Sequence, residues 1–294
     1  MDSSFKDDLL HHYTDAELAY YIQGSPRLSS YSKIFLLSAN HLAKYCSRDL
    51  IEDTCKAMNT AHSLGIRVPI VKRVVEYEDN TYYIMERIDG ITLEDAWASL
   101  SWFTSLRLAV FLLCSVRLLR SSVSSTAGSL STGRCRSFWL EDHYGLPAKS
   151  TFEDVASFIQ FWTNFVSMRQ ARNGKTLRTN KYTPTTANLF VFTHHDLAPR
   201  NLLLDRCGHL WLLDWDIAGW YPSYFEYASM HNFSPQGWSW LTQTRWNLFT
   251  WIAAGCWEKE RCMLEQIRSK FTRFSAGRRF QLLRDGGPSA RPVS

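Results

Sequence analysis

One stretch of the sequence, residues 192–216, constrains the fold and the chemistry more than any other. Its first part reads His194-His195-Asp196-Leu197-Ala198-Pro199-Arg200-Asn201, lies between two short apolar runs, and is followed one hairpin later by Asp214. Phosphoryl transfer from a nucleotide needs a carboxylate beside the acceptor hydroxyl, and an amide oxygen and a second carboxylate around magnesium. We therefore predict that Asp196 accepts the acceptor's proton and that Asn201 and Asp214 hold Mg²⁺. The alternative is that these residues only make hydrogen bonds within turns.

The sequence before this stretch predicts a small unit rich in β-structure. Thr14 and Glu17 form a capping-box pattern, which predicts a short helix that ends near Gly24. Between residues 24 and 88, apolar runs and helical spacing alternate in the order strand, strand, helix, strand, strand. The expected strands cover residues 33–38, 41–46, 71–77 and 81–88, and the expected helix covers 47–64.

Beyond residue 88 the pattern becomes mainly helical. Helices are expected around residues 93–97, over 106–119, from Thr151 onward and from Tyr224 onward, with short strands at 188–193, 202–204 and 210–213. Residues 121–137 are rich in Ser, Thr and Gly and predict a loop. The fold class predicted is α+β, with an N-lobe at 1–88, a C-lobe at 89–276 that carries the catalytic loop, and a loose tail at 277–294.

Three segments carry a resemblance to a known family. They are residues 188–228, which include Asp214-Trp215-Asp216-Ile217-Ala218-Gly219-Trp220-Tyr221-Pro222, the pair Val68-Pro69, and residues 83–97, whose pattern is common in fungal relatives. The chain resembles the aminoglycoside phosphotransferase and choline kinase-like family, which shares the protein kinase fold. The resemblance implies a small β-rich N-lobe with one main helix, a nucleotide cleft, and a larger, mainly helical C-lobe.

The resemblance also assigns roles in nucleotide binding. Lys44 looks like the lysine that contacts the α- and β-phosphates, and Met85 to Ile88 resemble the hinge between the lobes. The backbone carbonyl of Glu86 and the amide of Ile88 would then face the adenine edge, with Met85 at the back of the purine pocket. The implied cofactors are ATP, or another nucleoside triphosphate, and Mg²⁺.

Two features depart from the family pattern. The helix that should offer Lys44 a carboxylate carries Glu52 and Asp53, but helical spacing places Thr54 nearest the cleft; of the two acids, we favour Glu52. No glycine lies between residues 25 and 64, so the backbone N–H groups of the segment Ser38-Ala39-Asn40 are expected to face the phosphates in place of a glycine-rich loop. Asp216 is expected to bind metal or substrate, or to complete a loop hydrogen-bond network.

Composition excludes several other classes of protein. The net charge of +5 comes from scattered basic residues, which does not indicate nucleic-acid binding. The longest apolar run, residues 108–116, is shorter than the roughly 20 residues that cross a bilayer, so no membrane span is expected. Acids precede any apolar stretch at the N-terminus, which predicts a cytoplasmic protein. The seven cysteines show no paired spacing and are expected to be reduced, and a zinc site at His195, Cys207 and His209 is not favoured.

The acceptor is predicted from charge and aromatic content. Eight of the twelve tryptophans fall between Trp211 and Trp257, which indicates either a core packed with large rings or an aromatic-walled ligand pocket. Residues 220–276 hold four acids and six bases, a poor match for polycationic aminoglycosides. A neutral or aromatic hydroxylated small molecule is expected instead. Its pocket is expected to be lined by some of Trp220, Trp238, Trp240 and Trp246.

The sequence therefore predicts an ATP-dependent phosphotransferase that acts on a hydroxyl group of a small molecule. The alternative is a catalytically impaired, kinase-like nucleotide-binding or regulatory module. A protein kinase is disfavoured because Ala198 stands where protein kinases have a lysine, and Asp214-Trp215-Asp216 replaces their Asp-Phe-Gly. His194 is expected to organise the catalytic loop through hydrogen bonds.

Overall fold

The computed structural model describes residues 5–29, 33–140, 146–165, 189–233 and 237–273. The chain forms two compact units. The N-terminal unit comprises residues 1–97 and 199–216, and the C-terminal unit comprises 98–198 and 217–294. This division differs from the predicted one, which placed the boundary after residue 88 and all of 89–276 in the C-lobe. Residues 89–97 and 199–216 pack with the N-terminal unit instead. The predicted tail at 277–294 lies outside the described residues.

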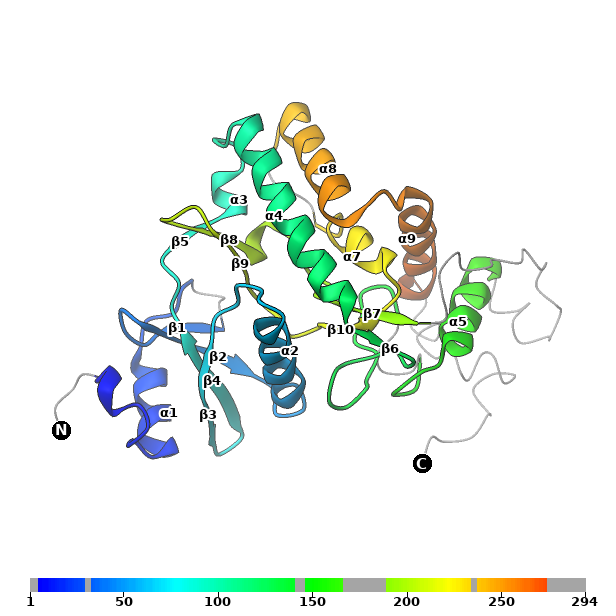
Figure 1. Ribbon diagram of the computed structural model, residues 1–294. Helices are drawn as coiled ribbons and strands as arrows, with labels where there is room; N and C mark the ends of the chain where they lie inside the picture. The colour runs from blue at the N-terminus through cyan, green and yellow to red at the C-terminus, as the bar shows by residue number, and fades with distance from the viewer. Residues whose placement is uncertain (1–4, 30–32, 141–145, 166–188, 234–236, 274–294) are drawn as a thin grey trace. The chain divides into compact units, whose positions relative to one another are not determined.

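The N-terminal unit is built on a four-stranded antiparallel sheet (Figure 1). Its order is β1-β2-β4-β3, and the two hairpins predicted from the sequence are both present. The strands are β1 (Ile34–Leu36), β2 (His41–Cys46), β3 (Val71–Tyr77) and β4 (Asn80–Glu86). Lys44 lies on β2 between Ile34 of β1 and Tyr83 of β4.

Two helices lie on opposite faces of this sheet (Figure 1): α1 (Asp15–Gly24) and α2 (Ile51–Ser63). α1 begins at the predicted capping box, in which Thr14 and Glu17 exchange hydrogen bonds. The buried side chains of α1 pack with Ala43 of β2 and its neighbours in one apolar cluster. Because side chains alternate along a strand, Lys44 points to the other face. A short 3-10 helix, η1 (Asp7–Leu9), precedes α1.

A second sheet of the N-terminal unit joins distant parts of the chain. Its order is β5-β8-β9, with β5 at Gly90–Thr92, β8 at Leu202–Asp205 and β9 at Leu210–Leu212. The segments α3 (Leu93–Ala96) and η2 (Pro199–Asn201) adjoin it in sequence. β5 was not predicted, because it begins at the pair Asp89-Gly90, which is typical of a turn. A Cβ on Gly90 would lie 2.4 Å from the Leu204 carbonyl oxygen, so only glycine permits this pairing.

The C-terminal unit is mainly helical, and α4 lies beside α8 (Figure 1). A three-stranded sheet of order β10-β7-β6 brings the segment before Asp196 next to residues 219–221. The helices are α4 (Trp102–Ser121), α5 (Phe152–Asn164), α7 (Tyr224–Ser229), α8 (Trp240–Ala254) and α9 (Glu258–Arg273), and the strands are β6 (Val123–Ser124), β7 (Phe190–Thr193) and β10 (Gly219–Tyr221).

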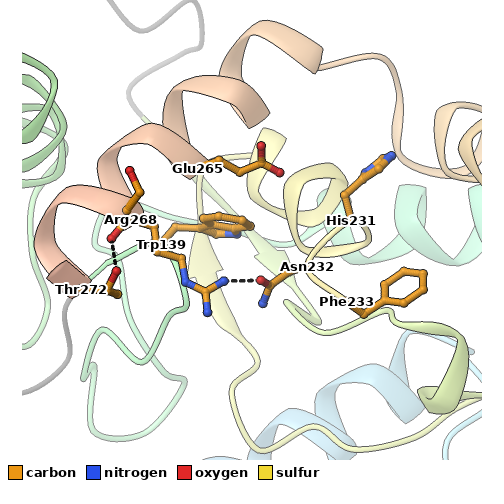
Figure 2. Close-up of a pocket in the computed structure, with 8 residues that line it drawn as sticks. Trp139, His231, Asn232, Phe233, Glu265, Arg268 and Thr272 are labelled. Atoms are coloured by element: carbon orange, nitrogen blue, oxygen red, sulfur yellow. Dashed lines mark hydrogen bonds between the residues drawn. The ribbon is translucent and has the colours of Figure 1, made fainter. Parts of the chain in front are cut away.

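The tryptophans named for the acceptor pocket pack in the core or lie exposed, so the predicted tryptophan pocket is not supported. Trp246 is fully buried and donates from Nε1 to the Met230 carbonyl. Trp220 packs against Phe192, Trp238 packs against Trp246, and Trp240 is exposed. None of these four lines the pocket that contains Lys44, the pocket beside Arg268 (Figure 2), or the pocket beside Arg67. Rings at these spacings fill the interior because each removes a large apolar area from water.

Helix α4 alone among the described helices has the length and composition of a membrane span, with a mean hydropathy of 1.6. Core helices of soluble proteins pass the same test, and α4 buries Leu108, Leu112 and Val116. The expectation that no segment crosses a membrane stays a prediction. All seven cysteines are free, as expected.

Candidate active site

Lys44 lies at the centre of a charged cluster in the N-terminal unit. Its ammonium donates to Asp214 Oδ1 at 2.7 Å and to Asp216 Oδ2 at 2.8 Å. Burial alone would lower the pKa of Lys44, but Tyr83 and the two aspartates outweigh it and hold that pKa well above its usual range. Lys44 is therefore charged at every physiological pH.

Asp216 is the less exposed of the two aspartates. Its Oδ1 also accepts a hydrogen bond from Thr54 Oγ1 at 3.3 Å. Burial raises the pKa of Asp216 despite the opposing effect of Lys44, while the neighbouring Asp214 charge raises it further. The loop after β9 therefore supplies a carboxylate, that of Asp216, which anchors Lys44. The sequence had left the role of Asp216 open.

The predicted pairing of Lys44 with Glu52 is wrong. Glu52 lies on the exposed side of α2, and it is not among the partners of Lys44. At about 100° per residue, the turn of α2 that buries Ile51 and Thr54 directs Glu52 to solvent. Thr54, which the sequence placed nearest the cleft side, contacts Asp216.

The β8–β9 hairpin brings Asn201 and Asp214 together. Leu202 pairs with Leu212, and the Leu213 amide donates to the Asn201 carbonyl at 2.9 Å. Asp214 follows directly and has a φ of 64°, a left-handed conformation that is uncommon outside glycine. Such strain persists where the surrounding structure imposes it, often at functional sites. Here Trp215 supplies part of that support, since its buried Nε1 donates to the Leu212 carbonyl at 3.0 Å.

These side chains share one pocket of about 480 Å³, lined entirely by residues of the N-terminal unit. Lys44, Asn201 and Asp214 lie among its polar groups, together with the charged residues Glu86, Arg87, Asp89, Asp95 and Arg200. Much of the remaining lining is apolar, from Ile34, Leu36, Leu42, Met58, Leu203 and Leu213. The predicted hinge residues Met85, Glu86 and Ile88 also line it. A largely apolar pocket with a few convergent polar groups is typical of a ligand site.

Ser38 does not line this pocket, and its expected role is not supported. The Ser38 hydroxyl donates to Asp7 Oδ1 at 2.6 Å and accepts from the amides of Asn40 and His41. The Ser38 amide donates to the His41 carbonyl. Since the Ser38 and Asn40 N–H groups are satisfied within the turn, these two are not free to bind phosphates. Asp7, which the sequence did not single out, organises the turn instead.

In the C-terminal unit, Asp196 follows a segment that a buried glutamate holds. Glu226 of α7 accepts from the His194 amide at 2.7 Å and from the His195 amide at 3.1 Å. His194 Nδ1 accepts from the Asp196 amide at 3.2 Å, so His194 organises the loop as predicted. Burial raises the pKa of Glu226 to about 7 against the lowering effects of these amides and of Arg120. Sequence analysis missed Glu226 in this role because it lies 30 residues from Asp196.

His195 is part of an aromatic stack and lies outside the group of possible metal ligands found among the described residues. It is fully buried, with ring centroids 4.8 Å from Tyr221 and 5.8 Å from Phe225. Burial lowers the pKa of His195 to about 3, so its imidazole is neutral. Asp205, not His195, joins Cys207 and His209, with ligand atoms within 4.8 Å of one another. Asp205 already accepts from the His209 amide and from Trp211 Nε1, as a turn requires.

Comparison with known proteins places these features in a class. A model of the phosphotransferase enzyme family matches residues 132–261, which include the catalytic loop and Asp214. The aminoglycoside phosphotransferase APH(3'')-Id from Streptomyces rimosus is similar in structure, with 15% identity, a TM-score of 0.51, and coverage of 87% of this chain and 99% of that chain. A thermostable variant of aminoglycoside phosphotransferase APH(4)-Ia, solved with AMP-PNP and hygromycin B, has 14% identity, a TM-score of 0.51, and coverage of 90% and 94%. No curated protein matches the sequence.

The chain thus has a kinase-like α+β fold, and its residues 132–261 match the phosphotransferase enzyme family. This match agrees with the resemblance to phosphotransferases inferred from the sequence. The predicted enzyme class, a phosphotransferase with an alcohol group as acceptor, is confirmed at the same level.

Proposed function

We propose that this enzyme transfers the γ-phosphoryl group of ATP, or of another nucleoside triphosphate, to a hydroxyl group of a small molecule. The observation that carries the proposal is the pocket of the N-terminal unit, where Lys44, Asn201 and Asp214 meet beside apolar walls. Phosphoryl transfer depends on positioning and on charge stabilisation, and these groups supply both.

The nucleotide occupies this pocket in the proposal. Its base lies against Met85 and the apolar walls, with the backbone of Glu86 and Ile88 at its edge. The Ile88 amide has no backbone acceptor among the described residues, which leaves it available to a ring nitrogen of the base. The phosphates lie near Lys44, whose ammonium is held in place by Asp214 and Asp216.

The residues present suit a magnesium ion. Asp214 is 42% exposed at its side chain, and it lines the pocket together with Asn201. A carboxylate and an amide oxygen, completed by phosphate oxygens and water, form the kind of ligand set that Mg²⁺ takes in nucleotide sites. When bound, Mg²⁺ neutralises charge on the phosphates.

Asp196 acts as the base. The hydroxyl proton of the acceptor passes to the Asp196 carboxylate, the hydroxyl oxygen forms a bond to the γ-phosphorus, and the bond to the β-phosphate oxygen breaks to release the nucleoside diphosphate. The geometry that supports this role is the fixation of the loop by Glu226 and His194, which holds the Asp196 backbone in one conformation. Acceptors are small molecules, and we propose a cytoplasmic location with no nucleic-acid or membrane partner.

The test is substitution of Asp196 by alanine. We expect Asp196→Ala to abolish phosphoryl transfer and to change ATP affinity no more than about threefold, because the side chain serves the acceptor and not the nucleotide. Asp79→Asn in the exposed β3–β4 turn is the matched control and should leave both unchanged. Transfer in the Asp196→Ala variant at the rate of the unmodified enzyme would refute the role of Asp196. Nucleotide binding with no transfer to any acceptor by the unmodified chain would instead favour the impaired-module alternative.

A further inference from the structure

Asp7, in the short helix η1 that precedes α1, holds the turn between β1 and β2. Its Oδ1 accepts from Ser38 Oγ at 2.6 Å and lies 2.8 Å from His41 Nδ1, and its Oδ2 accepts from Asn40 Nδ2 at 2.7 Å. All three partners belong to one turn, more than 30 residues along the chain from Asp7. Both oxygens of one carboxylate are therefore used to fix this turn.

The Asp7 carboxylate is charged at neutral pH. Burial alone would raise its pKa, but the hydrogen bonds from Ser38, His41 and Asn40 outweigh burial and hold the pKa of Asp7 below its usual range. An ionised carboxylate has no proton to donate, so His41 Nδ1 is the donor in its contact. Hydrogen bonds to an ionised acceptor are roughly twice as strong as those between neutral groups. Asp7 therefore holds the turn more firmly than a neutral side chain would.

The position of Asp7 is itself fixed against the sheet. Phe5 packs edge-to-face on the His41 ring, with centroids 6.2 Å apart. Leu10, directly after η1, is buried in the apolar cluster beneath α1, and its carbonyl accepts from Arg73 of β3 at 2.9 Å. Contacts on both sides of η1 thus make Asp7 a rigid support for the turn.

The same turn is also bonded to the hinge segment, residues 85–88. The Arg87 amide donates to the Asn40 carbonyl at 2.8 Å, and Arg87 Nη1 donates to the Ser38 carbonyl at 3.1 Å. In the sheet, His41 pairs with Glu86. Both Glu86 and Arg87 line the pocket of about 480 Å³. The turn thus connects η1 to two lining residues of that pocket.

The strand ends beside the turn supply part of the wall of this pocket. Leu36 of β1 pairs with Leu42 of β2, and both line the pocket. We call this pair the leucine wall. Leu36 lies two residues before Ser38, and Leu42 directly follows His41. Because the connection is so short, a displacement of the turn also displaces the leucine wall.

We propose that Asp7 is a positioning residue for the nucleotide: by holding the β1–β2 turn, it keeps the leucine wall and the hinge in the geometry that binds the nucleotide. The inference rests on the proposed function, which assigns this pocket to the nucleotide. Asp7 is not among the residues that line the pocket, so it acts through the turn. Coupling between two sites is reciprocal, so bound nucleotide should in turn stabilise the contact of η1 with the turn.

The test measures binding of AMP-PNP, an ATP analogue, with Mg²⁺ to the full chain. Calorimetry gives the dissociation constant and the number of binding sites separately. We expect Asp7→Asn to raise the dissociation constant about tenfold and to leave the number of sites unchanged, because loss of the charge weakens the bonds that hold the turn. Asp8→Asn, which removes the neighbouring exposed carboxylate of η1, is the matched control and should change neither. Asp7→Glu keeps the charge and should recover part of the affinity.

A second variant acts from the other side of the contact. Asn40→Ala removes one partner of Asp7 at an exposed position and should raise the dissociation constant about threefold. Melting temperatures check that each variant folds, and Asn40→Ala decides the question if Asp7→Asn does not fold. Hydrogen exchange without nucleotide gives an independent measurement. The amides of His41 and Arg87 should exchange faster in Asp7→Asn or Asn40→Ala than in the unmodified chain, and Asp8→Asn should leave them unchanged.

The outcomes separate the possible failures. A purely structural role of Asp7 predicts fewer binding sites at an unchanged dissociation constant, and that result would overturn the inference. Unchanged exchange at His41 and Arg87 would overturn it as well. Normal AMP-PNP binding by the unmodified chain with equal affinity in the Asp7 and Asn40 variants would refute this inference alone and leave the proposed function standing. An unmodified chain that binds no AMP-PNP would refute the proposed function, and the inference with it.

Discussion

Lys44 in the N-terminal unit and Glu226 in the C-terminal unit are both buried charged side chains, but they are satisfied in different ways. Lys44 contacts the carboxylates of Asp214 and Asp216, and Asp214 still reaches a pocket. Glu226 is 1% exposed and accepts from two backbone amides of the segment before Asp196. A charged group paired with other side chains can exchange those partners for a ligand. A charged group that is hydrogen-bonded to backbone amides instead fixes that backbone, which here is the segment before Asp196. We therefore call Lys44 with its partner Asp214 the ligand-binding charge, and Glu226 the positioning charge.

Removing the positioning charge should have the largest effect. Glu226→Ala leaves the His194 and His195 amides without acceptors and leaves Arg120 without the anion that faces it. We expect a loss of about 3–5 kcal/mol in the free energy of unfolding at pH 8, measured by urea denaturation. A loss below about 1 kcal/mol would show that water replaces the carboxylate and that Glu226 does not hold the loop.

The pH dependence of stability should also reveal Glu226. Its pKa is raised to about 7, so between about pH 4.5 and pH 7 the folded state keeps a proton that the unfolded state releases. Stability from this group is therefore greatest at low pH and falls as the pH rises through that window, by on the order of 3 kcal/mol. We therefore compare the free energy of unfolding of the unmodified protein with that of Glu226→Gln. The unmodified protein should lose stability relative to the variant as the pH rises from about 4.5 to about 7. His195, with a pKa lowered to about 3, acts in the opposite direction and is present in both proteins.

The ligand-binding charge should show its effect only when the ligand is present. Asp214→Asn should weaken magnesium-dependent ATP binding on the order of 100-fold and metal-free ATP binding far less, because the carboxylate is proposed to serve the metal. Titrations with and without Mg²⁺, followed by fluorescence or calorimetry, measure both affinities. Equal losses in the two titrations would mark Asp214 as a structural partner of Lys44 alone.

The smallest effect concerns which acid supports Lys44. Asp216→Asn should lower the free energy of unfolding by about 1–2 kcal/mol, since Lys44 keeps Asp214 and loses one charged partner. Glu52→Gln, at the exposed position that the sequence favoured, should change stability by no more than about 0.5 kcal/mol. Thermal unfolding of the two variants side by side gives the answer. The opposite order would restore Glu52 as the anchor.

Local patterns in the sequence were sufficient to predict most elements of the fold. The capping box at Thr14 and Glu17, the hairpins around Lys44 and Met85, and the α+β class all depend on neighbours within a few residues. The catalytic-loop spacing from Asp196 to Asn201 is likewise a short-range pattern, which is why the family and enzyme class could be inferred from it. Strands β5 and β10 escaped, because each begins at a glycine, Gly90 or Gly219, and glycine is typical of a turn or loop.

What the sequence by itself determined is the set of local elements and the spacing of Asp196 and Asn201, from which the enzyme class was inferred. Only the tertiary structure decided the partners of each charge: Asp216 in place of Glu52 for Lys44, Asp7 for the turn at Ser38, and Glu226 for the loop before Asp196. The tryptophans illustrate the same division, since their number indicated large rings in the interior, while their positions in the fold decided that Trp139 lines a pocket and Trp246 does not. The physical reason is that burial and long-range hydrogen bonds join residues far apart in the chain, and no local spacing records which distant groups will meet.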